Sequence, residues 1–314
     1  MSGPRALITG DAGFIGRHFR RYLERRGWQV FGCDLVDGED CRDLFRDPDP
    51  WPRIDLFIHA AAIVGGRATI DGEPLKVATD LAIDSDAFQW ALKARPGRVL
   101  YFSSSAAYPV AQQRGPGVRL HEDHLSAPWV PTPDDWDDPY GVGAPDQSYG
   151  WVKVTGEYLA HLARAEGLDV TVVRPFSGYG SDQSLDYPFP TFIQRALACR
   201  DGATTFDVWG DGRQVRDWIH VDDVVAGCFA VMESGTTDPV NLCTGRGVSF
   251  LDLAGMVLDA AGVPRPGGPA IVPHPDAPTG VRYRVGDPTR MNRYYRHTID
   301  LEDGIARALR EATR

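Results

Sequence analysis

The chain has 314 residues, 43% of them hydrophobic and 24% charged, which is ordinary for a globular protein and enough for one large domain or two coupled ones. The formal net charge of −10 argues against nucleic acid or an anionic membrane as the main partner. It does not exclude a small anionic ligand, because a few arginines can hold one against a negative background.

The start of the chain predicts a strand, a helix and a second strand, over residues 5–9, 17–26 and 28–34. Gly27 is expected to end the helix. A turn with three regularly spaced glycines and two apolar residues joins the first strand to the helix: Gly10, Gly13, Phe14, Ile15 and Gly16.

Each of these glycines has a physical role in binding a dinucleotide. The first allows the tight turn, the second lets the backbone approach a pyrophosphate, and the third lets the helix pack close to the sheet. Asp34 ends the second strand, at the position of the acid that grips ribose hydroxyls. Because its charge repels a 2′-phosphate, the sequence predicts NAD rather than NADP.

Two later strands run into small or hydroxylated residues. Residues 54–59 and 98–102 predict these strands, residues 37–52 mainly a loop, and residues 74–94 a helix. We expect His59 to be a buried, satisfied histidine. The residues that follow the two strands are Ala60, Ala61, Ala62, Ser103, Ser104 and Ser105. Ligands bind at the carboxyl ends of such strands, so the alanines would let a flat cofactor lie close and the serines would face a ligand.

Residues 109–148 form the irregular part of the chain, rich in proline and with an acidic run. Long loops in compact domains are commonly lids or binding loops, and a solvated surface loop is the alternative. Trp129 and Trp136 favour a lid that packs on another surface.

Tyr149 and Lys153 lie four residues apart at the start of a predicted helix. Residues at this spacing share a helix face, so the phenol and the ammonium would lie side by side. A nearby cation favours the ionised form of an acid, which predicts a lowered pKa for the phenol and a general base that can return its proton.

The remaining elements continue an α/β pattern. We expect strands over residues 169–173 and 282–284, a strand near Arg216 followed by a helix with an acidic N-cap at residues 222–223, and helices from Pro188, over 250–261 and over 301–312. The prediction is a Rossmann-type doubly wound parallel sheet with a smaller C-terminal α/β substrate domain. The NAD-binding domain would span residues 1–176, with 217–247 returning to it, and the substrate domain mainly 177–314.

Five cysteines are scattered along the chain, without C-x-x-C or a metal-ligand spacing with histidine. No signal-peptide core and no membrane-spanning stretch is evident in the sequence. We therefore expect reduced thiols, a cytoplasmic location, no metal site and no membrane partner.

The ordered set of motifs resembles the extended short-chain dehydrogenase/reductase family, in its nucleotide-sugar epimerase/dehydratase branch, which includes UDP-galactose 4-epimerases and GDP-mannose 3,5-epimerases. The motifs that carry the resemblance are Gly10-x-x-Gly13-Phe-Ile-Gly16, Asp34, Ile58-His-Ala-Ala-Ala62, Ser103-Ser-Ser, Tyr149-x-x-x-Lys153, Arg174-Pro-Phe-Ser-Gly-Tyr-Gly180, Gly212-Arg-Gln-Val-Arg216-Asp-Trp-Ile-His-Val-x-Asp223 and Gly280-Val-Arg282-x-Arg284. They cover nearly the whole chain.

The resemblance implies that Tyr149 takes a proton from a sugar hydroxyl, usually at C4, while a hydride moves from that carbon to NAD. Ser104 would hydrogen-bond the same oxygen, and Arg216 and Arg282 would hold the diphosphate of a UDP- or GDP-hexose. The implied NAD contacts are Gly10, Gly13, Phe14, Ile15, Gly16, Asp34, Asp43, Leu44, Ala60, Ala61, Ala62, Ser103, Tyr149, Lys153 and Pro175. The implied substrate contacts are Gly65, Ser104, Ser105, Tyr149, Ser177, Arg216 and Arg282. A homodimer through the helices around residues 74–94 and 149–165 is also implied.

Departures from the family pattern narrow the reaction. The dehydratases carry an Asp-Glu pair where this chain has Ser105 and Ala106, and the 3,5-epimerases need a cysteine at Ala106 and a lysine near Tyr187. What remains is oxidation and re-reduction at C4, which is 4-epimerisation. Dehydration, 3,5-epimerisation and 4-keto-sugar reduction stay open. They would need acid–base groups from the insertion, such as those of residues 121–124 (His-Glu-Asp-His), or free exchange of NADPH. A non-catalytic dinucleotide-binding sensor is the alternative of another class.

Overall fold

A six-stranded parallel sheet forms the centre of the computed structural model, which describes residues 3–46, 53–63, 65, 67–125, 144–264 and 267–313. Its strand order is β2-β1-β3-β4-β5-β9. The strands are β1 (Arg5–Thr9), β2 (Gln29–Cys33), β3 (Leu56–His59), β4 (Val99–Phe102), β5 (Val170–Pro175) and β9 (Val240–Leu242). This confirms the doubly wound α/β fold.

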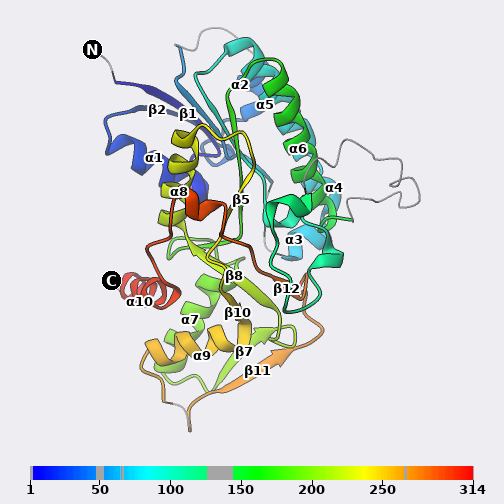
Figure 1. Cartoon of the computed structure of the whole chain (residues 1–314). Coiled ribbons are helices and arrows are strands. Elements are labelled where there is room, and N and C mark those ends of the chain that lie inside the picture. The colour runs from blue at the N-terminus through cyan, green and yellow to red at the C-terminus, as the bar shows by residue number, and fades with distance from the viewer. Residues whose placement is uncertain are drawn as a thin grey trace, which may run out of the picture.

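Helices cover both faces of this sheet (Figure 1). One face carries α1 (Phe14–Glu24) and α8 (Val221–Ser234), and the other carries α2 (Cys41–Arg46), α5 (Asp80–Ala94) and α6 (Gln147–Ala165). The alternation of strand side chains sets the two cores: Ala6 and Ile8 face α1 and α8, whereas Leu7 faces α5 and α6. All three are fully buried, as expected for a central parallel strand.

A second, smaller unit lies beyond the carboxyl ends of these strands, at the bottom of Figure 1. It holds a sheet of β10 (Gly247–Ser249), β8 (Val215–His220) and β12 (Tyr283–Arg284), with β6 (Ser177–Tyr179) also paired to β8. A parallel pair, β7 (Thr205–Trp209) and β11 (Ala270–His274), and three helices, α7 (Pro188–Arg200), α9 (Phe250–Ala260) and α10 (Leu301–Ala312), complete it.

The chain crosses between the two units more than once. It leaves the large sheet after β5, returns to it with α8 and β9, and leaves again with β10. Strand β8 (Val215–His220) overlaps the start of the segment 217–247, but it pairs with β6, β10 and β12 rather than with the large sheet. The domain limits drawn from the sequence stay a prediction.

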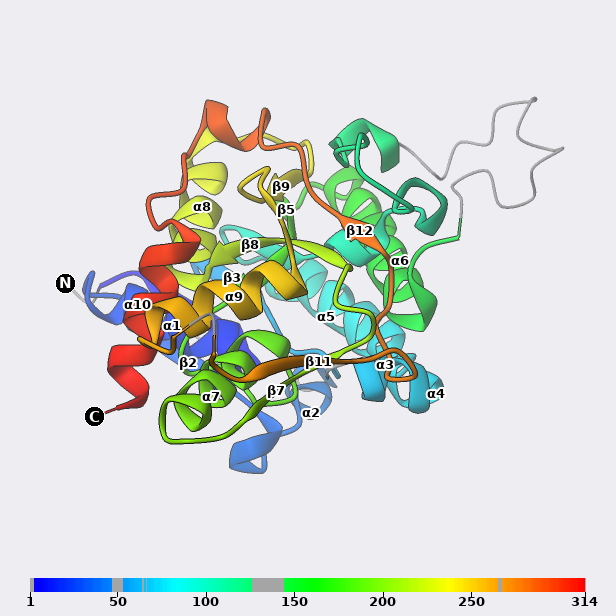
Figure 2. The same ribbon diagram turned by 90° about the horizontal axis from the view of Figure 1, so that it is seen from below.

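Short elements connect the main ones: η1 (Leu35–Asp37), α3 (Arg67–Gly72), α4 (Pro74–Val77), η2 (Ser105–Ala107), η3 (Val110–Gln112), η4 (Glu122–Leu125) and η6 (Met291–Arg293). Figure 1 places α3 near β12, and a Cβ on Gly280, just before β12, would lie 3.1 Å from the Arg67 side chain of α3. Figure 2 shows β7 and β11 side by side. The segment with Trp129 and Trp136, for which a lid was expected, lies outside the described residues.

The structure corrects two predicted elements. The predicted loop over residues 37–52 contains α2, because Cys41 and Phe45 bury themselves in the core beneath α5 and this packing outweighs the acidic composition. The single helix over 74–94 is two helices, since the backbone tightens at Thr79, whose N–H donates to the carbonyl of Lys76.

Two helix starts also differ from the sequence prediction. The first helix begins at Phe14 instead of Arg17, directly after Gly13 as its N-cap. The N-cap of α8 is His220 and not an acid: its Nδ1 accepts from the N–H of Asp222 at 3.1 Å, and the two acids occupy the first turn. No helix within the described ranges is both long and apolar enough to cross a membrane.

Candidate active site

The glycine turn fits a dinucleotide because its backbone has no room for other side chains. Gly10 has φ +73°, and a Cβ there would lie 2.8 Å from the backbone of Ala61. A Cβ on Gly16 would lie 2.1 Å from the carbonyl oxygen of Gly10. The start of α1 has no side-chain cap, so its amides stay available to a pyrophosphate.

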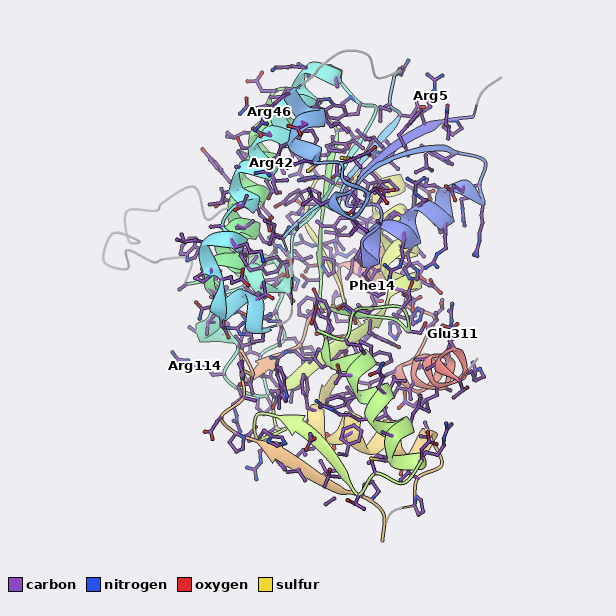
Figure 3. All side chains as sticks on the ribbon, turned by 180° about the vertical axis from the view of Figure 1, so that it is seen from behind. Arg5, Phe14, Arg42, Arg46, Arg114 and Glu311 are labelled. Carbon is purple, nitrogen blue, oxygen red and sulfur yellow. The ribbon has the colours of Figure 1, made fainter. Side chains whose placement is uncertain are left out.

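Asp34 is held beside this turn by two backbone amides. Its Oδ2 accepts from the N–H of Ala12 at 3.1 Å and its Oδ1 from the N–H of Val36 at 2.9 Å. The carboxylate is thus fixed at the end of β2, next to the place where a bound ribose would follow the pyrophosphate. Phe14 stands at the entry of α1 near the middle of the molecule (Figure 3), with its ring against Gly180.

The other expected cofactor residues divide into two groups. Ala60, Ala61, Ala62 and Pro175 follow or end β3 and β5 and are partly exposed at the carboxyl edge of the sheet. Asp43 instead pairs with Arg46 at 3.0 Å, with 76% of its side chain exposed, and Leu44 packs against the core beneath α5. Among the described contacts, neither residue reaches the glycine turn. The cofactor role of Asp43 and Leu44 stays a prediction.

Tyr149 and Lys153 lie one turn apart at the start of α6. The Nζ of Lys153 is 5.5 Å from the centre of the Tyr149 ring and 5.4 Å from that of Tyr101, and the lysine is 4% exposed. Burial alone lowers the pKa of Lys153, but the charges of Tyr149, Asp84 and Asp80 outweigh it and raise the pKa above its usual value. Lys153 is therefore a persistent cation next to the phenol.

Two buried carboxyl groups surround Lys153 from α5. Asp84 pairs with Nε2 of His59 at 3.0 Å and accepts from the Tyr101 hydroxyl, and Nδ1 of His59 meets the Thr9 hydroxyl at 2.8 Å. The prediction of a satisfied, buried His59 is confirmed. Asp84 went unnoticed in the sequence, where its signal was an acid in the interior of an amphipathic helix.

Asp80 is the second of these carboxyl groups. It has no exposed surface, and its Oδ1 accepts from the N–H of Ile63 at 2.7 Å. Burial raises its pKa to about 6. Lys153 therefore has two acidic neighbours on α5: Asp84, whose pKa is lowered, and Asp80, whose pKa is raised to about 6.

The serine turn is docked against the first turn of α6. Ser104 caps η2, its Oγ accepting from the N–H of Ala106 at 3.1 Å. The N–H of Asp146 donates to the carbonyl of Ala106 at 3.0 Å, and a Cβ on Gly150 would lie 2.6 Å from that oxygen. Ser104 and Tyr149 are therefore carried by two backbone segments in direct contact.

The remaining serines and Gly65 have distinct surroundings. The Ser103 hydroxyl donates to Glu157, which is paired with the buried Arg174, so Ser103 is turned into the core. Ser105 is 5% exposed, whereas Ser177 and Gly65 are partly exposed. The predicted site roles of these serines and of Gly65 are not tested by these contacts.

Glu122, one of the acid–base candidates of residues 121–124, is buried. Its Oε1 accepts from the N–H of Asn241, so its side chain is bound to strand β9.

Three arginines gather around one carboxylate beside Tyr149. Arg67 donates through Nη1 to both oxygens of Asp146, at 2.9 and 3.0 Å, and Arg284 donates through Nη2 at 2.7 Å. Burial, with the charges of Arg284 and Arg67, lowers the pKa of Arg216 to about 9. The cluster carries more positive than negative charge in a poorly hydrated place, which favours an anionic ligand.

This arrangement differs from the expected arginine pair. Arg216 is in the cluster, but Arg282 is not: its side chain is 58% exposed and pairs with Asp211 at 3.4 Å. Arg284, two residues later, takes the inner position, and Arg67 joins from α3. No sequence motif pointed to Arg67.

Comparisons with known proteins agree with these features. The model of the family described as "NAD dependent epimerase/dehydratase family" matches residues 6–243. A dTDP-4-dehydro-6-deoxy-D-allose reductase of Streptomyces sp. is 29% identical, over 99% of this chain and 95% of that protein. GDP-mannose 3,5-epimerase 1 of Oryza sativa subsp. indica is 27% identical, over 96% of this chain and 79% of that protein.

Solved structures show the same fold. The UDP-glucose 4-epimerase of Thermotoga maritima, crystallised with UDP-glucose, has a TM-score of 0.76 at 24% identity and covers 99% of this chain and 100% of its own. The dTDP-glucose 4,6-dehydratase DesIV of Streptomyces venezuelae has a TM-score of 0.75 at 25% identity, over 98% of this chain and 96% of its own.

Proposed function

Because the chain belongs to the NAD dependent epimerase/dehydratase family, whose cofactor is NAD, we propose that it epimerises a nucleotide sugar at C4 through a transient 4-keto sugar. The observation that carries the substrate class is the arginine cluster beside Tyr149. A nucleoside diphosphate would supply the negative charge that this cluster lacks.

Each residue of the site has a defined task in this proposal. The glycine turn and Asp34 would hold NAD, which would supply a reversible acceptor for the hydride of the sugar carbon. The phenolate of Tyr149, stabilised by the buried Lys153, takes the proton of the C4 hydroxyl and becomes a neutral phenol. Ser104 donates to the same oxygen and steadies the growing carbonyl.

The diphosphate would be held by Arg216 and Arg284. Arg284 replaces Arg282 in this role, because the exposed Arg282 faces Asp211 while Arg284 lies beside Tyr149 in the buried cluster. The planar guanidinium groups suit bidentate contacts with phosphate oxygens. Substrate contacts by Gly65, Ser105 and Ser177 remain part of the proposal as the sequence predicted them.

The choice of C4 epimerisation over the other reactions is based on acid–base residues that are missing from the serine turn. Ser105 and Ala106 supply no acid–base pair for eliminating water or inverting C3 and C5. A second candidate is a 4-keto-sugar reductase, favoured by the 29% identity to a 4-keto-sugar reductase over nearly the whole chain. In that reaction Tyr149 gives its proton to the keto oxygen instead of taking one. A non-catalytic sensor would have no need of the intact Tyr149–Lys153 pair.

Location and assembly complete the proposal. All five cysteines are buried and free, which fits a reducing cytoplasm. A homodimer would use the outer face of α5 and α6, where Leu81, Trp151 and Leu162 are each about two-fifths exposed.

The test is product analysis with UDP-, GDP- and dTDP-hexoses in deuterated water, followed by NMR. Simple 4-epimerisation predicts an inverted C4 without loss of water and without deuterium at C3 or C5. Deuterium at those carbons, or a dehydrated product, would contradict it. Turnover only of 4-keto sugars with added reduced nicotinamide would favour the reductase. Tyr149→Phe is the matched inactive control.

A further inference from the structure

We propose that Asp146 is an internal stand-in for the substrate's phosphate: it occupies the arginines while the site is empty, and yields them when a diphosphate binds. Because Asp146 is the N-cap residue of α6, this exchange couples substrate binding to the position of the first turn of α6, which carries Tyr149. The inference rests on the proposed function, since it assumes that a nucleoside diphosphate is the ligand of the cluster.

The contacts of Asp146 are those of a bound anion. Both carboxylate oxygens accept from Arg67, and Oδ2 also accepts from Arg284 at 2.7 Å. Only 8% of the Asp146 side chain is exposed, against 19% for Arg67 and 12% for Arg284. Burial alone raises the pKa of Asp146, but the two arginines outweigh it and lower the pKa, so the group is a carboxylate.

One carboxylate is too little charge for this cluster. Two guanidinium groups donate to it, and that of Arg216 meets two backbone carbonyls, of Val215 and Thr279, in place of an acid. A diphosphate carries more charge and more acceptor oxygens than Asp146, so it competes for the same N–H donors. Arg284 keeps a second partner, the Oε1 of Gln113 at 2.6 Å, when it turns from Asp146 to the ligand.

The main chain of Asp146 joins the two catalytic segments. Its N–H donates to the carbonyl of Ala106 behind the Ser104 turn, and its carbonyl accepts from the N–H of Gly150 beside Tyr149, at 3.0 and 2.9 Å. A displacement of Asp146 therefore reaches Ser104 and Tyr149 together.

The backbone between Asp146 and Tyr149 is strained. Although aspartate is a favoured N-cap, the side chain of Asp146 does not cap α6 and faces the arginines instead. The next residue, Gln147, has φ +56°, a left-handed conformation that strains the backbone of a non-glycine residue. Release of Asp146 by a diphosphate lets this strain relax and resets the first turn of α6. Asp146 is thus a positioning residue for Tyr149.

The test measures binding and turnover separately. UDP, GDP and dTDP are titrated by calorimetry into wild type and Asp146→Asn, each with NAD bound. Removal of the competing charge is expected to tighten diphosphate binding by about fivefold or more. In the complex Asp146 has already released the arginines, so KM for the nucleotide sugar is expected to fall while kcat changes by less than about twofold. Asp146→Glu keeps the charge and restores the weaker binding.

Two controls separate this role from general damage. Asp71→Asn removes only the other partner of Arg67, an exposed i,i+4 pair, and leaves the affinity unchanged. If Asp146→Asn does not fold, Arg67→Gln/Asp146→Asn removes one charge of each sign and is compared with Arg67→Gln; the double variant binds more tightly. Equal or weaker diphosphate binding in both comparisons overturns the inference alone. A wild type that binds no diphosphate overturns the proposed function and the inference with it.

Discussion

The carboxyl group of Asp80 has no exposed surface. It lies one turn before Asp84 in α5 and close to the charge of Lys153. Its folded-state pKa of about 6 lies above the value of 3.8 for a free aspartate. An acid with a raised folded-state pKa stabilises the fold fully only below its unfolded pKa, and this contribution is lost as pH rises through the folded one. The charged form of Asp80 is thus tolerated at neutral pH at a cost in stability.

Replacing Asp80 by asparagine is expected to remove that cost. The amide oxygen still accepts from the N–H of Ile63, while the buried charge is gone. Thermal unfolding should show Asp80→Asn more stable than wild type near neutral pH by about 2–3 kcal/mol, with no gain near pH ~4. Asp86→Asn, a partly exposed change on the same helix, is the control. A pH-independent difference between Asp80→Asn and wild type would refute the account of this residue.

Arg284 and Arg282 give a matched pair of substitutions. Arg284→Met removes a guanidinium from the buried cluster and should weaken UDP or GDP binding by about tenfold to a hundredfold. Arg282→Met removes an exposed partner of Asp211 and should change the affinity by less than about twofold. Calorimetric titration of both variants decides which arginine faces the ligand. Equal losses would mean that the assignment is wrong.

The choice between these arginines lay beyond the sequence. Both stand in one short motif, two residues apart, and alternate residues of a strand share a face. The strand itself spans only Tyr283–Arg284, so Arg282 lies before it and turns to solvent. By contrast, Gly10 and Gly16 were predictable, because their spacing reflects a backbone approach that excludes any Cβ.

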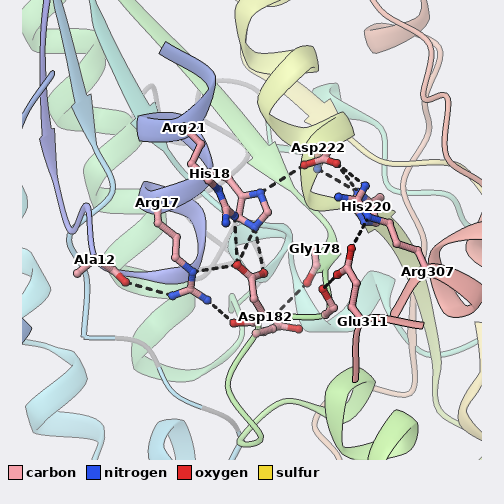
Figure 4. A network of polar contacts seen from close by, with 12 residues as sticks. Ala12, Arg17, His18, Arg21, Gly178, Asp182, His220, Asp222, Arg307 and Glu311 are labelled. Carbon is pink, nitrogen blue, oxygen red and sulfur yellow. Dashed lines mark hydrogen bonds and ion pairs between the residues drawn. The ribbon is translucent and has the colours of Figure 1, made fainter. Parts of the chain in front are cut away.

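At the scale of elements, α1 is fastened to three others by a polar junction around His18 (Figure 4). The Nε2 of His18 meets Asp182 at 3.0 Å and its Nδ1 meets Asp222 at 3.3 Å, and Arg307 of α10 donates to Asp222 at 2.7 Å. Asp182 also accepts from Arg17 at 3.0 Å. The helix that opens the cofactor site is thereby tied to α8, to α10 and to the loop after β6.

This junction predicts a pH dependence of stability. Burial lowers the pKa of His18, but the hydrogen bonds to Asp182 and Asp222 outweigh it and raise the pKa above 6.5. A cation with a raised folded-state pKa stabilises the fold fully below its unfolded pKa, and that contribution is lost as pH rises through the folded one. Wild type should therefore lose melting temperature from about pH 6.5 upward, and His18→Gln should lack this step. Parallel curves would refute the role of His18.

Short elements were the weakest part of the sequence prediction. α2 has only six residues, and its acidic, proline-flanked composition reads as a loop, whereas its two buried side chains decide the matter through contacts with α5. The prediction of one continuous helix over 74–94 was wrong for a related reason. The single tightened turn that separates α4 from α5 does not alter the periodicity of the sequence. The long elements were set by periodicity, and α10 matches its predicted range over 301–312.

At the scale of the whole molecule, the outer face of α5 and α6 bears on assembly. Trp151 and Leu162 are 44% and 42% exposed on α6, beside the 39% exposed Leu81 of α5. The proposed homodimer would bury them, so Trp151→Asp with Leu162→Asp should yield a folded monomer in sedimentation. Trp209→Asp, on an equally exposed tryptophan of β7, is the control and should leave the dimer intact. A monomeric wild type would contradict the proposed dimer.

The overall architecture followed from the order of motifs, because the glycine turn, the alanine run and the serine turn each follow a strand that the parallel sheet brings to one edge. The cluster of Arg67, Asp146 and Arg284 did not follow, since its members come from three segments that only the folded chain joins. The sequence therefore pointed to the glycine turn and to the Tyr149–Lys153 pair, but not to Arg67 or Asp146 of the arginine cluster.

The proposed epimerisation depends most on redox chemistry started by Tyr149 beside Lys153. The direct measurement is the near-ultraviolet absorbance of reduced nicotinamide after rapid mixing of the NAD-loaded protein with a nucleotide sugar. Wild type is expected to show a transient rise that decays as the keto sugar is re-reduced, and Tyr149→Phe, with unchanged melting temperature and diphosphate binding, to slow it by about a hundredfold or more. Turnover in wild type without any such transient in either single or multiple turnovers, or equal rates in the two proteins, would contradict the account.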